Sequence, residues 1–175
     1  MKKIVIGLIV LIGLILLGGY LLPSDYEVSR SVVIQSDEAT IYPMIANLKR
    51  WQDWSPWTKE RYEDMKSEYT GPEVGKDSKW SWTGDSSGNG SLLITDADPK
   101  SGIAYDLRFE DYPVSKCHLS LKRVDNGVEV TMTNAGSMGS APWARYFGLM
   151  MDSAMGAEFE KGLGNLKSLA EKKSG

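Results

Sequence analysis

Three patterns of hydrophobic and polar residues follow one another along the 175-residue chain. Ile4 to Leu22 is an unbroken run of apolar residues and glycines with one tyrosine. Residues 26 to 135 consist mainly of short segments in which apolar and polar residues alternate, as in a β-strand with one buried face. Residues 140 to 173 place apolar residues three and four apart, as in an amphipathic helix. The chain is therefore expected to contain an apolar N-terminal helix, a sheet and a long C-terminal helix.

The N-terminal run is long enough to cross a membrane. It has about 19 residues, which at roughly 1.5 Å per residue span about 28 Å, close to the thickness of the hydrocarbon layer. A transmembrane helix and a signal peptide both fit this length. The run ends at Pro23 without a clear small-x-small cleavage site, which favours an uncleaved anchor. We therefore expect residues 1–25 to anchor the chain and residues 26–175 to form one domain.

The charges beside the run predict its orientation. Lys2 and Lys3 precede it, whereas Asp25 and Glu27 follow it. Because basic residues stay on the cytoplasmic side, we expect a single-pass protein with a cytoplasmic N-terminus and an extracytoplasmic domain, periplasmic or extracellular.

Seven segments of the middle region are predicted to be strands. They are bounded by Gly, Pro, Asn and Asp residues, which favour turns. Asn126-Gly127 between two such segments is a strong hairpin signal. Short turns join antiparallel neighbours, so an antiparallel sheet is expected. The predicted strands cover residues 26–35, 64–70, 78–83, 91–97, 103–110, 114–124 and 128–135.

Two helical regions are expected, one after the first strand and one after the last. Ser36 is the expected N-cap of a short helix, and Pro43 within it predicts a kink or an early end. The long helix is expected from Ser140 to Lys173, with Ser140 as its cap and an interruption between Asp152 and Gly156.

The expected long helix contains three glycines in its second part, Gly156, Gly162 and Gly164. Each costs roughly 1 kcal/mol relative to alanine in a helix. Close packing of the helix against the sheet is one explanation. The alternative is that the missing side chains leave room for a ligand.

Three tryptophans, Trp51, Trp54 and Trp57, lie within seven residues. They are interpreted either as a hydrophobic plug at one end of the sheet or as the wall or mouth of a site for an apolar ligand. The two interpretations are compatible, because one tryptophan can fill space while its neighbour lines a cavity.

Composition narrows the classes of function. The net charge is −3, and without Lys2 and Lys3 the remaining 18 basic and 23 acidic residues give −5. This excess of acidic residues argues against nucleic acid as a partner. One cysteine, Cys117, and one histidine, His118, provide too few ligands for a zinc site, so no metal or other cofactor is expected.

The sequence provides little acid or base chemistry for an enzyme. His118 and Cys117 are neighbours on a predicted strand, so their side chains point to opposite faces and cannot pair as base and nucleophile. Glu110 lies on the charged face of its strand, and Asp53 is better explained as a cap than as a catalytic group. No catalytic residue is therefore assigned.

The order of elements, together with four local motifs, resembles the START-like (SRPBCC) superfamily, in particular its polyketide cyclase/dehydrase-like branch. The resemblance covers about residues 26 to 172 and is carried by residues 30–34, residues 88–91, residues 159–167 and the motif Trp51-Gln52-Asp53-Trp54-Ser55-Pro56-Trp57. It implies an α+β helix-grip fold, in which a curved antiparallel sheet of about seven strands wraps around the C-terminal helix. It also implies an internal cavity for an apolar molecule, although this fold supports many functions.

Three hypotheses follow. The first is a membrane-anchored domain that binds a hydrophobic small molecule or lipid without catalysis. The second is a cyclase- or hydrolase-like enzyme acting on a polyketide or lipid, and the third is a protein- or membrane-interaction module that uses residues 143–151. The candidate ligand-binding residues are Trp54 and Trp57 near the mouth of the cavity, with Trp80, Trp82, Tyr105, Phe109, Met151, Met155 and Phe159 inside it.

Overall fold

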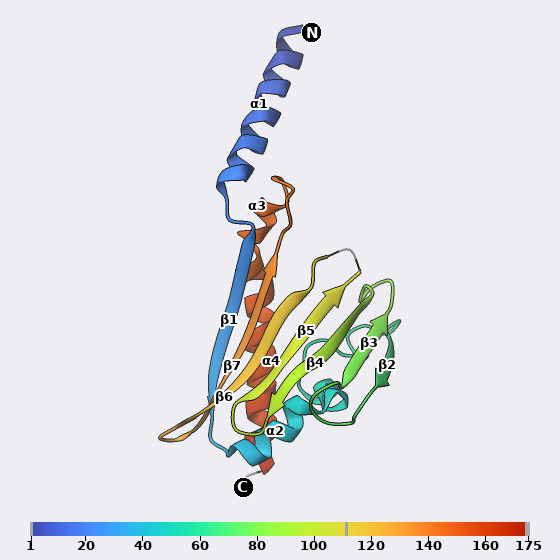
Figure 1. Cartoon of the computed structure of the whole chain (residues 1–175), viewed down its shortest axis with the longest axis vertical. Coiled ribbons are helices and arrows are strands. Elements are labelled where there is room, and N and C mark those ends of the chain that lie inside the picture. Colours follow the sequence, from blue (N-terminus) through green and yellow to red (C-terminus); the bar gives the residue numbers. More distant parts are fainter. Residues whose placement is uncertain (1, 111, 174–175) are drawn as a thin grey trace.

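A computed structural model describes residues 2–110 and 112–173 of the chain (Figure 1). Residue 1 of the expected anchor and residues 174–175 of the expected domain lie outside this part. The helices are α1 (Lys2–Leu21), α2 (Glu38–Ala46), the 3-10 helix η1 (Leu48–Asp53), α3 (Arg145–Gly148) and α4 (Met151–Lys173). The strands are β1 (Asp25–Ile34), β2 (Lys66–Thr70), β3 (Lys79–Thr83), β4 (Gly90–Asp98), β5 (Gly102–Phe109), β6 (Ser115–Val124) and β7 (Gly127–Ser137).

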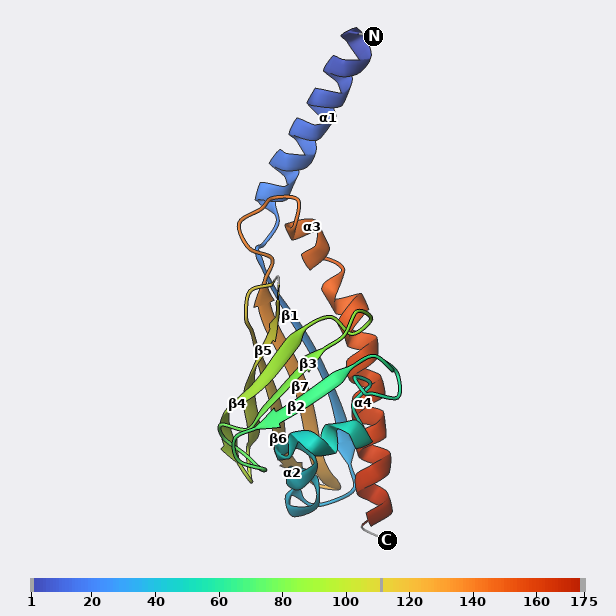
Figure 2. The same ribbon diagram turned by 90° about the vertical axis from the view of Figure 1, so that its right-hand side faces the viewer.

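The seven strands form one antiparallel sheet in the order β1-β7-β6-β5-β4-β3-β2. The sheet curves around α4, which packs mainly against β1, while α2 and η1 cover the remaining part of the concave side (Figures 1 and 2). The expected α+β helix-grip fold is therefore confirmed. All seven predicted strands are present, with ends that differ by two residues or fewer.

Strand β6 shows how the alternating pattern builds the sheet. Cys117 and Leu119 are buried in the core, whereas His118 and Ser120, which alternate with them, are exposed. The predicted hairpin follows, and Val124 pairs with Gly127 across it. A side chain at Gly127 would collide with the main chain of Ile34, and its φ of 142° also favours glycine, so the turn requires this residue.

Helix α2 corrects the expected N-cap. Asp37, not Ser36, caps it, because the Asp37 carboxylate accepts a hydrogen bond from the main-chain N–H of Thr40 at 2.8 Å. The helix continues through Pro43 and ends at Ala46, three residues later, which agrees with an early end.

Two of the clustered tryptophans fasten η1 to the end of α2. The indole N–H of Trp51 donates to the carbonyl of Ile45 at 2.8 Å, and that of Trp54 donates to the carbonyl of Met44 at 3.0 Å. These carbonyls belong to the last turn of α2, where no intrahelical donor is left for them. Both rings are buried in the core, so Trp51 and Trp54 have the structural role that the plug interpretation assigned to them.

The C-terminal helix is divided, but not where the sequence predicted. Ser140 caps no helix; residues 142–144 form a turn, α3 is one short helix, and α4 begins at Met151 after a turn at residues 149–150. The break thus follows Gly148, and α4 runs without interruption through Asp152–Gly156. Gly156 does not break the helix because it packs against Arg30 of β1.

Helix α1 extends away from the rest of the chain, and the described termini lie at opposite ends of the molecule (Figure 1). It is the one helix among the described residues that is long and apolar enough to cross a membrane, with a mean hydropathy of 2.8 and little of its surface covered. Helices of this kind near the N-terminus include both anchors and signal sequences.

Candidate functional site

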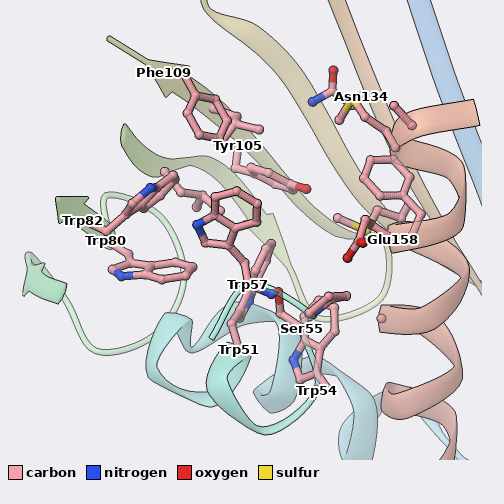
Figure 3. Close-up of a pocket in the computed structure, with 18 of the residues that line it drawn as sticks. Trp51, Trp54, Ser55, Trp57, Trp80, Trp82, Tyr105, Phe109, Asn134 and Glu158 are labelled. Atoms are coloured by element: carbon pink, nitrogen blue, oxygen red, sulfur yellow. Dashed lines mark hydrogen bonds between the residues drawn. The ribbon is translucent and has the colours of Figure 1, made fainter. Parts of the chain in front are cut away.

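A pocket of about 360 Å³ lies between the sheet and the first half of α4, and its walls are almost wholly apolar (Figure 3). Strands β3, β4, β5 and β7 form one wall, residues 51–57 a second and α4 the third. Ligand-binding pockets typically have volumes of about 300–1,000 Å³, so this pocket lies near the small end of that range. The lining residues are Trp51, Trp54, Ser55, Pro56, Trp57, Trp80, Trp82, Leu92, Tyr105, Leu107, Phe109, Met132, Asn134, Met151, Ala154, Met155, Glu158, Phe159 and Gly162.

All nine candidate residues from the sequence lie in this lining. Trp80, Trp82, Tyr105 and Phe109 come from the sheet, because alternate residues of β3 and β5 share its inner face. Met151, Met155 and Phe159 lie along one side of α4, four residues apart. One placement is corrected: Trp54 is only 1% exposed, so it forms the inner wall and not the mouth.

Several further lining residues were not predicted from the sequence. Met132 and Asn134 continue the inward alternation of Val128 and Val130 along β7, which is the signal that could have identified them. Glu158 follows Met151 by seven residues, two turns of the helix, but a charged residue was not expected to line an apolar pocket.

Trp57 sits at the centre of an aromatic group at one end of the pocket (Figure 3). Its ring centroid is 4.6 Å from that of Tyr62, 5.9 Å from that of Phe109 and 6.3 Å from that of Trp82. Trp82 also contacts Trp80 at 4.9 Å. Such tilted and edge-on contacts between aromatic rings are favourable, so these rings support one another at this end of the pocket.

Helix α4 is fitted to this wall through one of its glycines. A Cβ on Gly162 would lie 3.1 Å from Cδ of Pro56, whereas a Cβ on Gly164 would meet nothing within 4 Å. The close-packing explanation therefore holds for Gly156 and Gly162. Gly162 also lines the pocket. The other explanation, that a missing side chain leaves room for a ligand, therefore applies to Gly162 as well.

A buried polar group adjoins the pocket at its sheet wall. The Asn134 amide donates a hydrogen bond to Sγ of Cys117 at 3.2 Å, and the thiol also shares a hydrogen bond with the hydroxyl of Tyr105. Burial raises the pKa of Cys117 to about 12 and raises the pKa of Tyr105 well above its ordinary value. Both groups are therefore uncharged at neutral pH.

Glu158, the charged residue of the lining, forms an ion pair with Arg61, which does not line the pocket. Arg61 donates to both carboxylate oxygens of Glu158, at 2.5 and 3.1 Å. Chiefly through this hydrogen bonding, the pKa of Glu158 is lowered, so the carboxylate stays ionised and paired at neutral pH. The side chains of Glu158 and Arg61 are 40% and 41% exposed, which places the pair at the mouth of the pocket.

The groups considered for acid or base chemistry lie elsewhere. His118, Asp53 and Glu110 are all exposed, and none of them lines the pocket. Asp53 pairs with Arg50 at 2.8 Å, and Glu110 accepts a hydrogen bond from Asn89. These three side chains therefore do not form an acid–base pair inside the pocket.

The segment considered for an interaction surface is largely exposed. Trp143, Phe147, Leu149 and Met150 have 60% or more of their surface accessible, whereas Met151 turns into the pocket. The hypothesis of an interaction surface therefore keeps its basis over residues 143–150.

Comparison with known structures supports the fold. A protein of unknown function from Staphylococcus aureus matches 86% of this chain and 96% of its own, with 9% identity and a TM-score of 0.63. The solution structure of the Aha1 dimer from Colwellia psychrerythraea matches 81% of this chain and 96% of its own, with 13% identity and a TM-score of 0.56. At these identities the likeness is one of fold alone.

A third similar structure is that of a protein from a biosynthetic pathway. The di-domain ARO/CYC StfQ from the steffimycin biosynthetic pathway matches 86% of this chain with 11% identity and a TM-score of 0.63. The match covers 52% of StfQ, so this chain spans about half of that protein.

Sequence comparison identifies the family. No curated protein matches the chain at a significant level. The family model described as "Polyketide cyclase / dehydrase and lipid transport" matches residues 25–171, which include every strand of the sheet and all but the last two residues of α4. The chain therefore belongs to the polyketide cyclase/dehydrase and lipid transport family.

Proposed function

We propose that this protein is a membrane-anchored domain that binds a hydrophobic small molecule or lipid in its pocket and releases it unchanged. The observation that carries the proposal is the pocket of about 360 Å³ with almost wholly apolar walls. An apolar cavity binds apolar molecules without needing charged or catalytic groups, because water gains little by entering it. The nine candidate residues named from the sequence are the proposed contacts.

The chemistry of the lining supports binding without catalysis. Tyr105 in the lining and Cys117 beside it are held uncharged by burial, and the carboxylate of Glu158 is paired with Arg61. A general acid or base works best with a pKa near the operating pH, and none of these groups meets that condition. Among residues 2–110 and 112–173, no three His, Cys, Asp or Glu side chains gather into a metal site.

The proposed anchor is α1, with residues 1–25 as the membrane segment and residues 26–175 as the domain. Strand β1 begins at Asp25, four residues after α1 ends, so the linker is very short. A domain on so short a linker stays at the membrane surface. Lys2 and Lys3 before α1 favour a cytoplasmic N-terminus and an extracytoplasmic domain.

The proposal is tested on the full chain purified in a mild detergent. Organic extracts analysed by mass spectrometry are expected to contain a stoichiometric apolar molecule, and titration with lipids of different classes is expected to quench tryptophan fluorescence. An empty pocket that responds to no lipid class would refute it. A bound molecule whose mass changes during incubation with the protein would instead support the enzymatic alternative.

A further inference from the structure

The loop between β7 and α4 exposes an unusual number of large apolar side chains. We call residues 141–150, which contain α3, the α3 segment. The exposed fractions are 60% for Trp143, 62% for Phe147, 61% for Leu149 and 64% for Met150. A soluble surface rarely gathers so many large apolar groups in ten residues, and such a patch marks a contact with a partner or a membrane.

The α3 segment is fastened to α1 by hydrogen bonds. The Tyr146 hydroxyl donates to the carbonyl of Ile15 at 2.9 Å. Nη1 of Arg145 donates to the carbonyls of Tyr20 and Leu22 at 3.2 and 3.1 Å, and its guanidinium lies 5.7 Å from the centre of the Tyr20 ring. The last carbonyls of a helix lack intrahelical donors, so Arg145 completes the end of α1.

Two glycines of α1 make this contact possible. A Cβ on Gly18 would lie 2.5 Å from the hydroxyl of Tyr146, and one on Gly19 would lie 2.2 Å from the carbonyl oxygen of Pro142. Any larger residue at Gly19 would push the α3 segment away, because the atom it meets belongs to the main chain. Gly18 and Gly19 thus allow the α3 segment to pack closely against α1.

These contacts fix the depth of the α3 segment. Ile15 lies seven residues before Leu22, the end of the apolar run, which corresponds to about 10 Å along a helix. If α1 crosses the bilayer, Tyr146 reaches the outer part of the hydrocarbon layer, and Arg145 lies at its border. Amphipathic segments that lie in the interface bury their apolar side by about 5–10 Å, which agrees with this depth.

The α3 segment leads directly to the pocket. Met150 is followed by Met151, the first residue of α4, and Met151, Ala154 and Met155 line the pocket from the first turns of that helix. Ala154 is exposed and also lines the pocket, so the mouth opens at this end of α4. Figure 2 shows α3 and the beginning of α4 at the end of the domain that faces α1.

We infer that the α3 segment inserts into the bilayer leaflet on the domain's side, and that the pocket takes its ligand, a membrane lipid, from that leaflet. This inference rests on the proposed function, because it needs α1 to cross the membrane. The partner of the α3 segment is the bilayer, because this segment lies against the end of α1 and lipid surrounds a membrane-spanning helix wherever no protein covers it. The exposed apolar residues Phe147, Leu149 and Met150 directly precede Met151, Ala154 and Met155, which line the pocket.

Insertion is tested with the full chain reconstituted in phosphatidylcholine vesicles. A Phe147→Cys variant carries an environment-sensitive fluorophore, and Asp125→Cys in the exposed β6–β7 turn provides the matched control. Phosphatidylcholine with a doxyl group on the acyl chain is expected to quench the fluorophore at position 147 and leave that at position 125 unchanged. Equal, weak quenching at both positions would overturn the inference.

Lipid uptake from the leaflet is tested with a pyrene-labelled fatty acid, a single-chain lipid that suits the small volume of the pocket. The double variant F147E/L149E places two carboxylates on the α3 segment, and H118E/S120E places two on the solvent face of β6. Uptake from vesicles is expected to slow at least tenfold in the first and to stay unchanged in the second. Uptake from detergent micelles is expected to be equal in both.

The outcomes separate this inference from the proposed function. If the label at position 147 stays in water or F147E/L149E takes up lipid from vesicles normally, the inference fails, while a lipid recovered from the pocket leaves the binding function standing. If the wild-type protein takes up no lipid from vesicles or micelles, both fail.

Discussion

Arg61 and Glu158 join the loop that carries Trp57 to helix α4 by a two-pronged ion pair, with N–O distances of 2.5 and 3.1 Å. This loop, residues 54–65, connects η1 to β2. A second contact lies at its first residue, where the side-chain amide of Asn165 in α4 donates a hydrogen bond to the carbonyl of Trp54 at 3.0 Å. The ion pair is therefore the contact at the mouth, and the Asn165 bond lies seven residues farther along α4.

Removal of the Arg61 side chain should accelerate ligand release. Partly exposed ion pairs contribute about 0.2–1 kcal/mol, so Arg61→Ala is expected to raise the release rate by about 1.4-fold to fivefold. Transfer of a fluorescent lipid to acceptor vesicles, followed by stopped flow, measures the rate. Arg50→Ala is the control, because the ion pair of Arg50 with Asp53 lies within η1. Equal acceleration in both variants would show that the ion pair does not hold the mouth closed.

Acid should open the same contact. Hydrogen bonding from Arg61 lowers the pKa of Glu158, so the pair is intact above the ordinary glutamate pKa of about 4.3 and is lost as the pH falls through the lower folded value. Lipid release by the wild type is expected to be flat from pH 7 to pH 5 and to rise below about pH 4. Arg61→Ala should lack this rise. A parallel circular dichroism scan separates release from acid unfolding, and a rise of equal size in Arg61→Ala would contradict the prediction.

Filling the pocket should abolish binding without unfolding the protein. Met155→Trp adds a large side chain to the α4 wall, whereas Ala157→Trp adds the same side chain to an exposed position two residues later. Lipid affinity is expected to fall at least tenfold in the first, a loss of about 1.4 kcal/mol, and to be unchanged in the second. Fluorescence titration measures both, and thermal unfolding checks the fold. Full affinity in Met155→Trp would place the ligand elsewhere.

Two glycines of α4 should respond differently to alanine. Gly164→Ala meets no neighbouring atom and is expected to raise the free energy of unfolding by about 1 kcal/mol through helix propensity. Gly156→Ala is expected to bring no gain, because its methyl group displaces the Arg30 guanidinium, which pairs with Asp152 and Glu160 at 2.8 Å each. Urea unfolding compares the two variants. An equal gain in both would mean that Arg30 moves aside without losing its partners.

Local patterns were sufficient to predict the elements of the sheet and the inner faces of β3 and β5. The alternation along β5 identified Tyr105 and Phe109, and the helical spacing along α4 identified Met151 and Phe159, because both patterns report which side of an element is buried. The family resemblance supplied their arrangement around one cavity.

Contacts between distant segments were beyond the reach of such patterns. The pairing of Arg61 with Glu158 joins residues 97 positions apart, and that of Tyr146 with Ile15 joins residues 131 positions apart. Neither pair leaves a periodic signal. The predicted position of the helix break was wrong for a similar reason. Gly156 suggested a break from the sequence alone, but Arg30 of β1 packs against this glycine and the helix continues there.

The single cysteine should resist modification as long as the protein is folded. Burial raises the pKa of Cys117 to about 12, so at pH 8 only about one thiol in ten thousand is ionised, and the thiolate is the reactive form. Iodoacetamide at pH 8 is expected to leave the native full chain unlabelled and to label it completely in 6 M guanidinium chloride, about the concentration that unfolds very stable proteins. Mass spectrometry of the intact chain counts the added groups. Stoichiometric labelling of the native protein would mean that the core beside Tyr105 and Asn134 opens readily, and the sheet wall of the pocket would then be too mobile to hold the shape on which lipid binding depends.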